Sequence, residues 1–305
     1  MKLFLKVTFA VCSVMGLATG LFAQSPLGIK TCELPRDRRL GQFIVYVQGD
    51  PIPLGTRPNG KAAPILPAAQ PVPQVSELRG KISYPVGAGL GIIMQEDKHG
   101  PIKEKLEALT ALDPTDVRSL SIATEIDFEC FKLIERFQNL RELSLVVDEW
   151  LERDSACATL EQLSKLRKLG LSLSHDCRFG SSRFCEAILK MKELRYLSIP
   201  CEKLADRDVV GLATHPSLTQ IYLRSRSPVF GPSAMHALAN VRGLRELALV
   251  CTNYISDNDV IRFAGIDTLE IFCIATNAPL TCQEQFKQLR PDCYFFVQEP
   301  SNEAQ

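Results

Sequence analysis

The chain has 305 residues, of which 46% are hydrophobic and 23% charged, and its 35 basic residues balance its 35 acidic ones. These proportions are those of a folded globular protein, and they exclude a wholly disordered chain, a collagen-like chain and a chain with many membrane spans. The balanced charge and the low aromatic content of 7% argue against nucleic acid as a partner, because such proteins need a clustered basic surface or a stacking platform.

The N-terminus has the pattern of a secretory signal peptide. Two lysines precede an apolar run at residues 7 to 17, which is followed by small residues. This run is short for a membrane span, which needs roughly 20 apolar residues. We expect residues 1 to 23 to be removed by cleavage after Ala23, with cleavage after Ala18 or retention as an anchor as the alternatives. The mature protein would then keep no membrane span and lie in the periplasm, in the cell envelope or outside the cell.

Residues 24 to 74 form a proline-rich segment. Eleven of the 19 prolines lie between Pro26 and Pro101, and residues 51 to 73 combine them with glycine and alanine. Because proline lacks the backbone donor that a helix or a central strand requires, this segment favours an extended arm. We expect it to be largely unstructured, with one short strand at residues 43 to 47.

The sequence repeats itself from Val117 onward, with the pattern LxxLxL recurring at intervals of 23, 26, 28, 24, 26, 25 and 24 residues. The repeats begin at Val117, Leu140, Leu166, Leu194, Leu218, Leu244 and Leu269, and a degenerate eighth begins at Cys293. Each repeat predicts a short strand followed by a helix, with apolar positions 4 and 6 pointing inward and the residues between them outward. The expected strands are 118 to 122, 141 to 145, 167 to 171, 195 to 199, 219 to 223, 245 to 249 and 270 to 274.

Both ends of such an array need protection, because terminal repeats expose an apolar cross-section. We interpret residues 75 to 116 as an N-terminal cap, with a strand near 90 to 94 and a helix at 101 to 112. At the other end, residues 293 to 298 are expected to form the closing strand. Residues 299 to 305 form a polar tail.

Residues 117 to 298 resemble the leucine-rich-repeat superfamily, and in particular its ribonuclease-inhibitor-like and cysteine-containing subtypes. The segments 197 to 210 (LSIPCEKLADRDVV) and 247 to 260 (LALVCTNYISDNDV) look like the pattern of strand, cysteine, turn and acidic helix start in those subtypes. The resemblance implies an α/β fold, a right-handed solenoid curved like a horseshoe, with a parallel sheet on the concave side and helices on the convex side. Together with the signal peptide, the chain resembles exported bacterial leucine-rich-repeat proteins, which implies protein recognition without naming a partner.

The sequence offers little catalytic or metal-binding chemistry. His175, Asp176, Cys177 and Cys185 have the right types for metal ligands, but no close CxxC or HxxxH pair accompanies them,. No serine-hydrolase elbow, phosphate loop or pair of carboxylates on a shared face is present. We therefore expect a protein that is not an enzyme and that holds neither a metal nor a cofactor.

Export permits disulfides, so the cysteines have two interpretations. Cys157 and Cys185 occupy similar positions in the helical halves of neighbouring repeats and could form a disulfide, with Cys130 as a weaker competitor for Cys157. The alternative is that they are free and buried. That is the better interpretation for Cys201 and Cys251, because equivalent positions two repeats apart are roughly 10 Å apart.

The functional hypothesis is based on the residues at the outward strand positions. Tyr196 and Tyr222 occupy such positions on adjacent repeats, and Arg224 follows on the same side. Tyrosine and arginine dominate the energetics of many protein interfaces, so we expect a protein or peptide ligand on the concave face. The candidate binding residues are Lys168, Tyr196, Gln220, Tyr222, Arg224 and Glu246. The alternatives are an accessory or targeting subunit of an enzyme whose activity lies in, or is recruited by, the N-terminal segment, and a structural component of the cell envelope.

Overall fold

The computed structural model of the chain describes residues 29–35, 40–46, 75–79, 81–85, 88–95, 100–173, 180–201, 203–225, 230–251, 255–276 and 280–298. The expected signal peptide, the proline-rich stretch from 51 to 73, His175 with its two neighbours and the tail all lie outside these residues. Within the described part, no helix is long and apolar enough to span a bilayer.

The main feature is an eleven-stranded sheet with the order β13-β12-β11-β10-β9-β8-β7-β6-β5-β2-β3. Each strand predicted from the LxxLxL repeat is present, and the strands from β5 to β13 are all parallel. Their bounds are β5 Gly89–Met94, β6 Val117–Glu125, β7 Glu142–Val147, β8 Lys168–Leu173, β9 Tyr196–Pro200, β10 Gln220–Ser225, β11 Glu246–Cys251, β12 Ile271–Ala275 and β13 Tyr294–Gln298.

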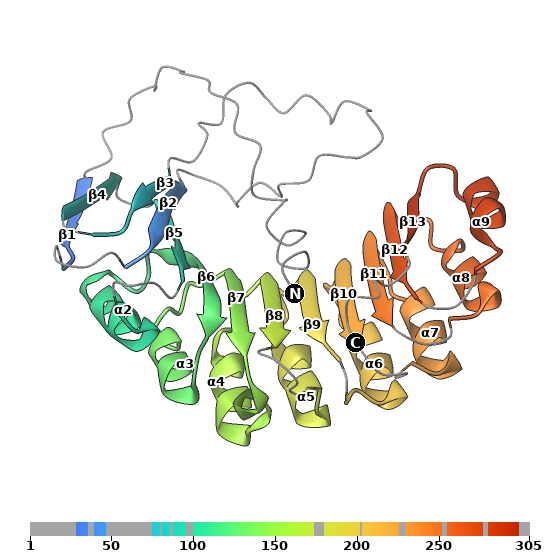
Figure 1. Ribbon diagram of the computed structural model, residues 1–305, viewed down its shortest axis with the longest axis horizontal. Coiled ribbons are helices and arrows are strands. Elements are labelled where there is room, and N and C mark those ends of the chain that lie inside the picture. The colour runs from blue at the N-terminus through green and yellow to red at the C-terminus, as the bar shows by residue number, and fades with distance from the viewer. Residues whose placement is uncertain are drawn as a thin grey trace, which may run out of the picture.

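A helix lies between each pair of successive strands from β5 to β13. Figure 1 shows the strands side by side along the inner side of an arc and the helices along its outer side. The helices are α2 Ile102–Ala108, α3 Phe128–Ile134, α4 Asp154–Gln162, α5 Ser182–Lys190, α6 Asp206–Ala213, α7 Pro232–Ala239, α8 Asp257–Phe263 and α9 Gln283–Leu289, and the 3₁₀ turns are η2 Leu109–Ala111 and η3 Glu149–Glu152. This arrangement is a mixed α/β fold in which a parallel sheet is flanked by helices.

The apolar repeat positions form one continuous core. Leu145, Leu171 and Leu249, at position 6 of their repeats, are fully or almost fully buried, as the two-residue strand period predicts,. At the C-terminal end, Phe272 stacks on Phe295 with ring centroids 5.2 Å apart. No single repeat encloses its own core, so the stability of each repeat depends on its neighbours.

Carboxylates link successive repeats where the helices begin. Asp206, at the start of α6, accepts a hydrogen bond of 2.7 Å from the backbone N–H of Gly231, at the start of α7. Asp257, at the start of α8 two repeats further on, does the same for Cys282 at 3.2 Å. A Cβ atom at residue 231 would lie 2.6 Å from Oδ2 of Asp206, so a larger residue there would have to displace this carboxylate. We call these contacts the carboxylate links.

The N-terminal part differs from the repeats because its added strands are antiparallel. The sequence predicts one strand between residues 24 and 74, whereas the structure has two. The bounds are β1 Ile29–Glu33, β2 Gln42–Tyr46, β3 Val75–Glu77 and β4 Lys81–Pro85. Strand β1 pairs with β4, and β2 lies between β3 and β5 in the large sheet. The second strand escapes prediction because β1 is completed by a partner about fifty residues away, so its local sequence carries only a weak signal.

Candidate functional site

Two tyrosines form an aromatic pair on the inner side of the arc. Tyr196 begins β9 and Tyr222 lies in the middle of β10, and their ring centroids are 5.2 Å apart with the planes tilted by 38°. The pairing of β9 with β10 brings them together, because Tyr222 lies opposite Ser198, two residues along the strand from Tyr196. Both side chains are half-buried, so each ring keeps part of its surface available to a ligand.

The hydroxyl group of Tyr222 is held by the next strand. It donates a short hydrogen bond to Oε2 of Glu246, which begins β11. Burial and the adjacent carboxylate raise the pKa of Tyr222 far above its usual value, because both disfavour a second negative charge,. Tyr222 therefore remains a neutral donor over the whole physiological range, and its ring is fixed in orientation.

The side chain of Arg224, on β10, reaches across β9 to β8. Its Nη2 donates to the backbone carbonyl of Leu171 at 2.7 Å and to the hydroxyl of Ser172 at 3.3 Å, two strands away on β8. The pairing of β8 with β9 ends at Gly170, so the guanidinium group supplies a donor just beyond the end of that ladder. The extended arginine side chain thus bridges β10 and β8.

Four of the six candidate binding residues therefore form one unit, which we call the tyrosine cluster: Tyr196, Tyr222, Arg224 and Glu246. Burial raises the pKa of Tyr196, and the nearby charge of Arg224 only partly opposes that effect. The cluster presents two neutral aromatic rings between a fixed cation and a fixed carboxylate. Such a surface suits a ligand with apolar and hydrogen-bonding groups.

The other two candidate residues lie beside the cluster. Gln220 is in register with both Tyr196 and Glu246. Lys168 instead forms an ion pair with Glu142 on β7, with Nζ and Oε1 2.8 Å apart. The structure therefore places Lys168 in a separate charged pair, nearer the N-terminal end of the sheet.

The proposed disulfide between Cys157 and Cys185 is absent from the structure, where both residues are free and buried. The thiol of Cys157 donates to the carbonyl of Leu151 in its own repeat, with Sγ 3.4 Å from the oxygen. Burial raises the pKa of Cys157 to about 11 and that of Cys185 to about 12. Both are therefore unreactive protonated thiols, as is typical of cysteines in an apolar interior. Cys201 is also free and buried.

A cavity that we did not anticipate from the sequence opens where β6 and β7 end. It has a volume of about 590 Å³, and its lining residues are Asp127, Phe128, Glu129, Asp148, Glu149, Trp150, Glu152 and Arg153. Asp127 accepts the N–H of Cys130 at the start of α3. The indole of Trp150 donates to the carbonyl of Ile126 at 2.7 Å. The acidic and aromatic residues that follow both β6 and β7 could have indicated this cavity. The contacts of Asp127 and Trp150 are structural.

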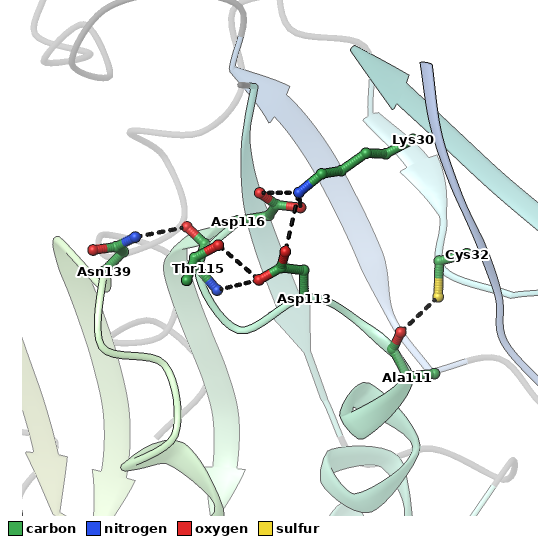
Figure 2. Close-up of polar contacts among 7 residues, drawn as sticks. All are labelled: Lys30, Cys32, Ala111, Asp113, Thr115, Asp116 and Asn139. Atoms are coloured by element: carbon green, nitrogen blue, oxygen red, sulfur yellow. Dashed lines mark hydrogen bonds and ion pairs between the residues drawn. The ribbon is translucent and has the colours of Figure 1, made fainter. Parts of the chain in front are cut away.

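A second unanticipated feature is an ion-pair network at the N-terminal end, which Figure 2 shows. Nζ of Lys30, on β1, lies 3.0 Å from Oδ2 of Asp113 and 2.9 Å from Oδ2 of Asp116. Thr115 donates two hydrogen bonds to Asp113, and Asn139 donates to the carbonyl of Thr115. These contacts, which we call the Lys30 clasp, attach the outlying β1 to the turn that leads into β6.

The described residues contain no group of three or more His, Cys, Asp or Glu side chains that could hold a metal ion. Three of the candidate ligands from the sequence, His175, Asp176 and Cys177, lie outside the described residues.

Comparisons with known proteins give a distant likeness. No protein-family model matches the chain, and no curated protein sequence matches it. Among solved structures, the chain is similar to a leucine-rich-repeat protein of Leptospira interrogans, with a TM-score of 0.38 and 14% sequence identity. The match covers 66% of this chain and 54% of that one, so this chain spans about half the length of the protein it matches. Independently of that match, the chain's own strand–helix repeats and parallel sheet form a leucine-rich-repeat-like fold.

Proposed function

We propose that the protein is a non-enzymatic binding protein that holds a protein or peptide ligand on the inner side of the arc, centred on the tyrosine cluster. The observation that carries this proposal is the Tyr196–Tyr222 pair, fixed by Glu246 and flanked by Arg224 on the face of the sheet away from the helices. Tyrosine and arginine provide large contact areas with polar ends, and they are enriched among the residues that contribute most to protein binding. Because the rings are already ordered, a ligand would meet a lower entropic cost on binding.

We further propose that the repeats follow the right-handed horseshoe course of the superfamily that the sequence resembles. Export by the signal peptide would place the mature protein in the periplasm, in the cell envelope or outside the cell. The ligand would then be another exported or envelope protein. Binding would require no cofactor and no nucleic acid.

The test begins with affinity capture of partners from the cell envelope of the source organism, followed by titration of the captured partner. We expect Tyr222→Ala to weaken binding by about 2 kcal/mol, or roughly thirtyfold, because a central aromatic contact is lost. Tyr222→Phe removes only the hydroxyl group and should have a smaller effect. Val210→Ala, at an exposed position on α6, is the control and should leave the affinity unchanged.

Unchanged affinity for both Tyr196→Ala and Tyr222→Ala would contradict the proposed site. The folding of each variant is checked by its unfolding midpoint. Truncating a half-exposed ring leaves the leucine core intact, so a large loss of stability is not expected.

A further inference from the structure

The last strand of the sheet, β13, leaves part of its backbone unused. Within the described residues it pairs only with β12. The N–H of Tyr294 donates to the carbonyl of Glu270, and the carbonyl of Gln298 accepts from Thr276. The N–H and C=O groups of one strand residue point to the same side, and that side alternates along the strand. Phe295 and Val297 therefore direct their backbone groups away from β12, toward the open edge.

Apolar side chains gather at this end of the molecule. Five large hydrophobic side chains are exposed among the described residues, and three of them lie on the last helix and the last strand, α9 and β13. These are Leu289, Tyr294 and Phe296, with exposed fractions of 53%, 41% and 43%. Tyr294 and Phe296 lie two residues apart on β13, so they share one face of the strand. The edge thus combines unused hydrogen-bonding groups with aromatic surface.

Proteins usually protect an exposed edge strand by shortening it, by charging it, or by placing a proline or a bulge in it. Strand β13 has five residues without a charge or a proline, and its register with β12 is regular. The opposite edge of the same sheet, β3, has only three residues. It also ends at Glu77, which forms an ion pair with Arg79 at 2.8 Å. The N-terminal edge is therefore protected and the C-terminal edge is not.

We propose that β13 pairs with the β13 strand of a second copy of this chain, in an antiparallel arrangement about a two-fold axis at Phe296. In this register Phe295 lies opposite the partner's Val297, and Val297 lies opposite the partner's Phe295. Both positions have outward backbone groups, so each is a hydrogen-bonded pair, and together the two pairs form four N–H···O=C bonds. Phe296 then faces the partner's Phe296 at the non-hydrogen-bonded position, where opposing side chains come closest.

The chemistry of the edge favours a copy of the same chain over a foreign strand. A two-fold axis pairs each outward N–H with an outward C=O of the other copy, and it places an aromatic side chain against an aromatic one. The full chain has no net charge, and removal of residues 1 to 23 with their two lysines leaves 33 basic against 35 acidic residues, so two copies repel each other only weakly at long range. Since the other edge is protected, such pairing stops at two copies and does not continue into a fibre.

The proposal is tested by sedimentation of the purified full-length chain from about 1 µM to about 100 µM, a range that reveals micromolar dissociation constants. We expect a reversible monomer–dimer equilibrium. Phe296→Lys places two like charges directly opposite each other and should weaken the dimer at least about tenfold. The matched control is Val210→Lys, at an exposed apolar position on α6, and it should leave the dimer unchanged. A chain that stays monomeric throughout, or a Phe296→Lys variant that associates as the wild type does, would overturn the proposal.

A second measurement does not depend on the lysine variant folding well. In Phe296→Cys, the two-fold axis brings the introduced thiols within reach of each other, because Cβ atoms at such positions are about 5 Å apart. Mild oxidation should then produce a dimer linked through position 296, identified by peptide mapping, whereas Val210→Cys should not. Absence of that linkage would overturn the proposal. So would dimerisation of a chain that ends at Gln298 when the full-length chain is monomeric, because the chain's own tail would then be the occupant of the edge.

Discussion

The two ends of the sheet differ in how the exposed edge of the repeat array is protected. At the N-terminal end, antiparallel strands are added to the repeats, and the Lys30 clasp attaches β1. At the C-terminal end, polar contacts hold the last helix: Arg290, which follows α9, donates to the carbonyls of Ile266 and Asp267 in the preceding repeat and of Leu269 at the start of its own. The sheet layer simply stops at β13. The comparison teaches that each layer of a repeat array needs its own closure, and that closing one layer does not close the other.

The largest expected effect concerns the core that supports the C-terminal end. Phe272 is fully buried and contacts Phe263, Phe286 and Phe295. We expect Phe272→Ala to lower the free energy of unfolding by about 3 to 5 kcal/mol, through lost burial and a residual cavity. Urea unfolding measures this loss. Phe296→Ala, on the exposed face of β13, is the control and should cost less than about 1 kcal/mol. Equal losses in the two variants would show that this end has no packed core of its own.

A smaller effect is expected at the N-terminal end. Lys30 and Asp113 are partly exposed although Asp116 is buried, so the contribution of the clasp is screened and amounts to about 1 kcal/mol,. We expect Lys30→Met to increase hydrogen exchange in β1 and β4 up to about fivefold, without affecting β9 to β13. Lys287→Met, which removes an exposed ion pair with Glu284 on α9, should leave exchange in β1 unchanged. Faster exchange throughout the sheet would contradict a local role for the clasp.

The clasp also has a predictable pH dependence. Hydrogen bonds from Thr115, and after them Lys30, lower the pKa of Asp113 to about 2. A lowered pKa in the folded state means that the stabilisation is present above the unfolded value of about 4 and is lost as the pH falls toward 2. Protection of β1 amides should therefore decrease between these two pH values. In Asp113→Asn that decrease should be smaller; an unaltered profile would assign the transition to another group.

The smallest effect is expected from the cysteines, which lie between the two ends. Burial raises the pKa values of Cys157 and Cys185 to about 11 and about 12, so neither should react with iodoacetamide in the folded protein. After denaturation without a reducing agent, both should be recovered alkylated. A linked Cys157–Cys185 peptide would instead show that the bridge forms after export.

The repeat body could be predicted from the sequence because its signal recurs with every strand. The same recurrence placed Tyr196 and Tyr222 on one face, since a two-residue period decides which side chains point outward. The reach of Arg224 to Leu171 could not be predicted, because it depends on where the pairing of β8 with β9 ends. The partnership of Lys30 with Asp113 joins residues 83 positions apart, and no local pattern encodes such a distance.

The carboxylate links determine how many repeats the chain can gain or lose at a time. Asp206 and Gly231 are 25 residues apart, as are Asp257 and Cys282, whereas Glu152 and the N–H of Gly180 are 28 residues apart. The starts of α5, α7 and α9 therefore each depend on a carboxylate supplied one repeat earlier. Helices α3 and α8 instead begin with a local cap, from Asp127 and Ser256. A duplication or deletion in the gene would preserve the links only if it kept each carboxylate in the same copy as the repeat that follows it, so the array would gain or lose repeats in pairs.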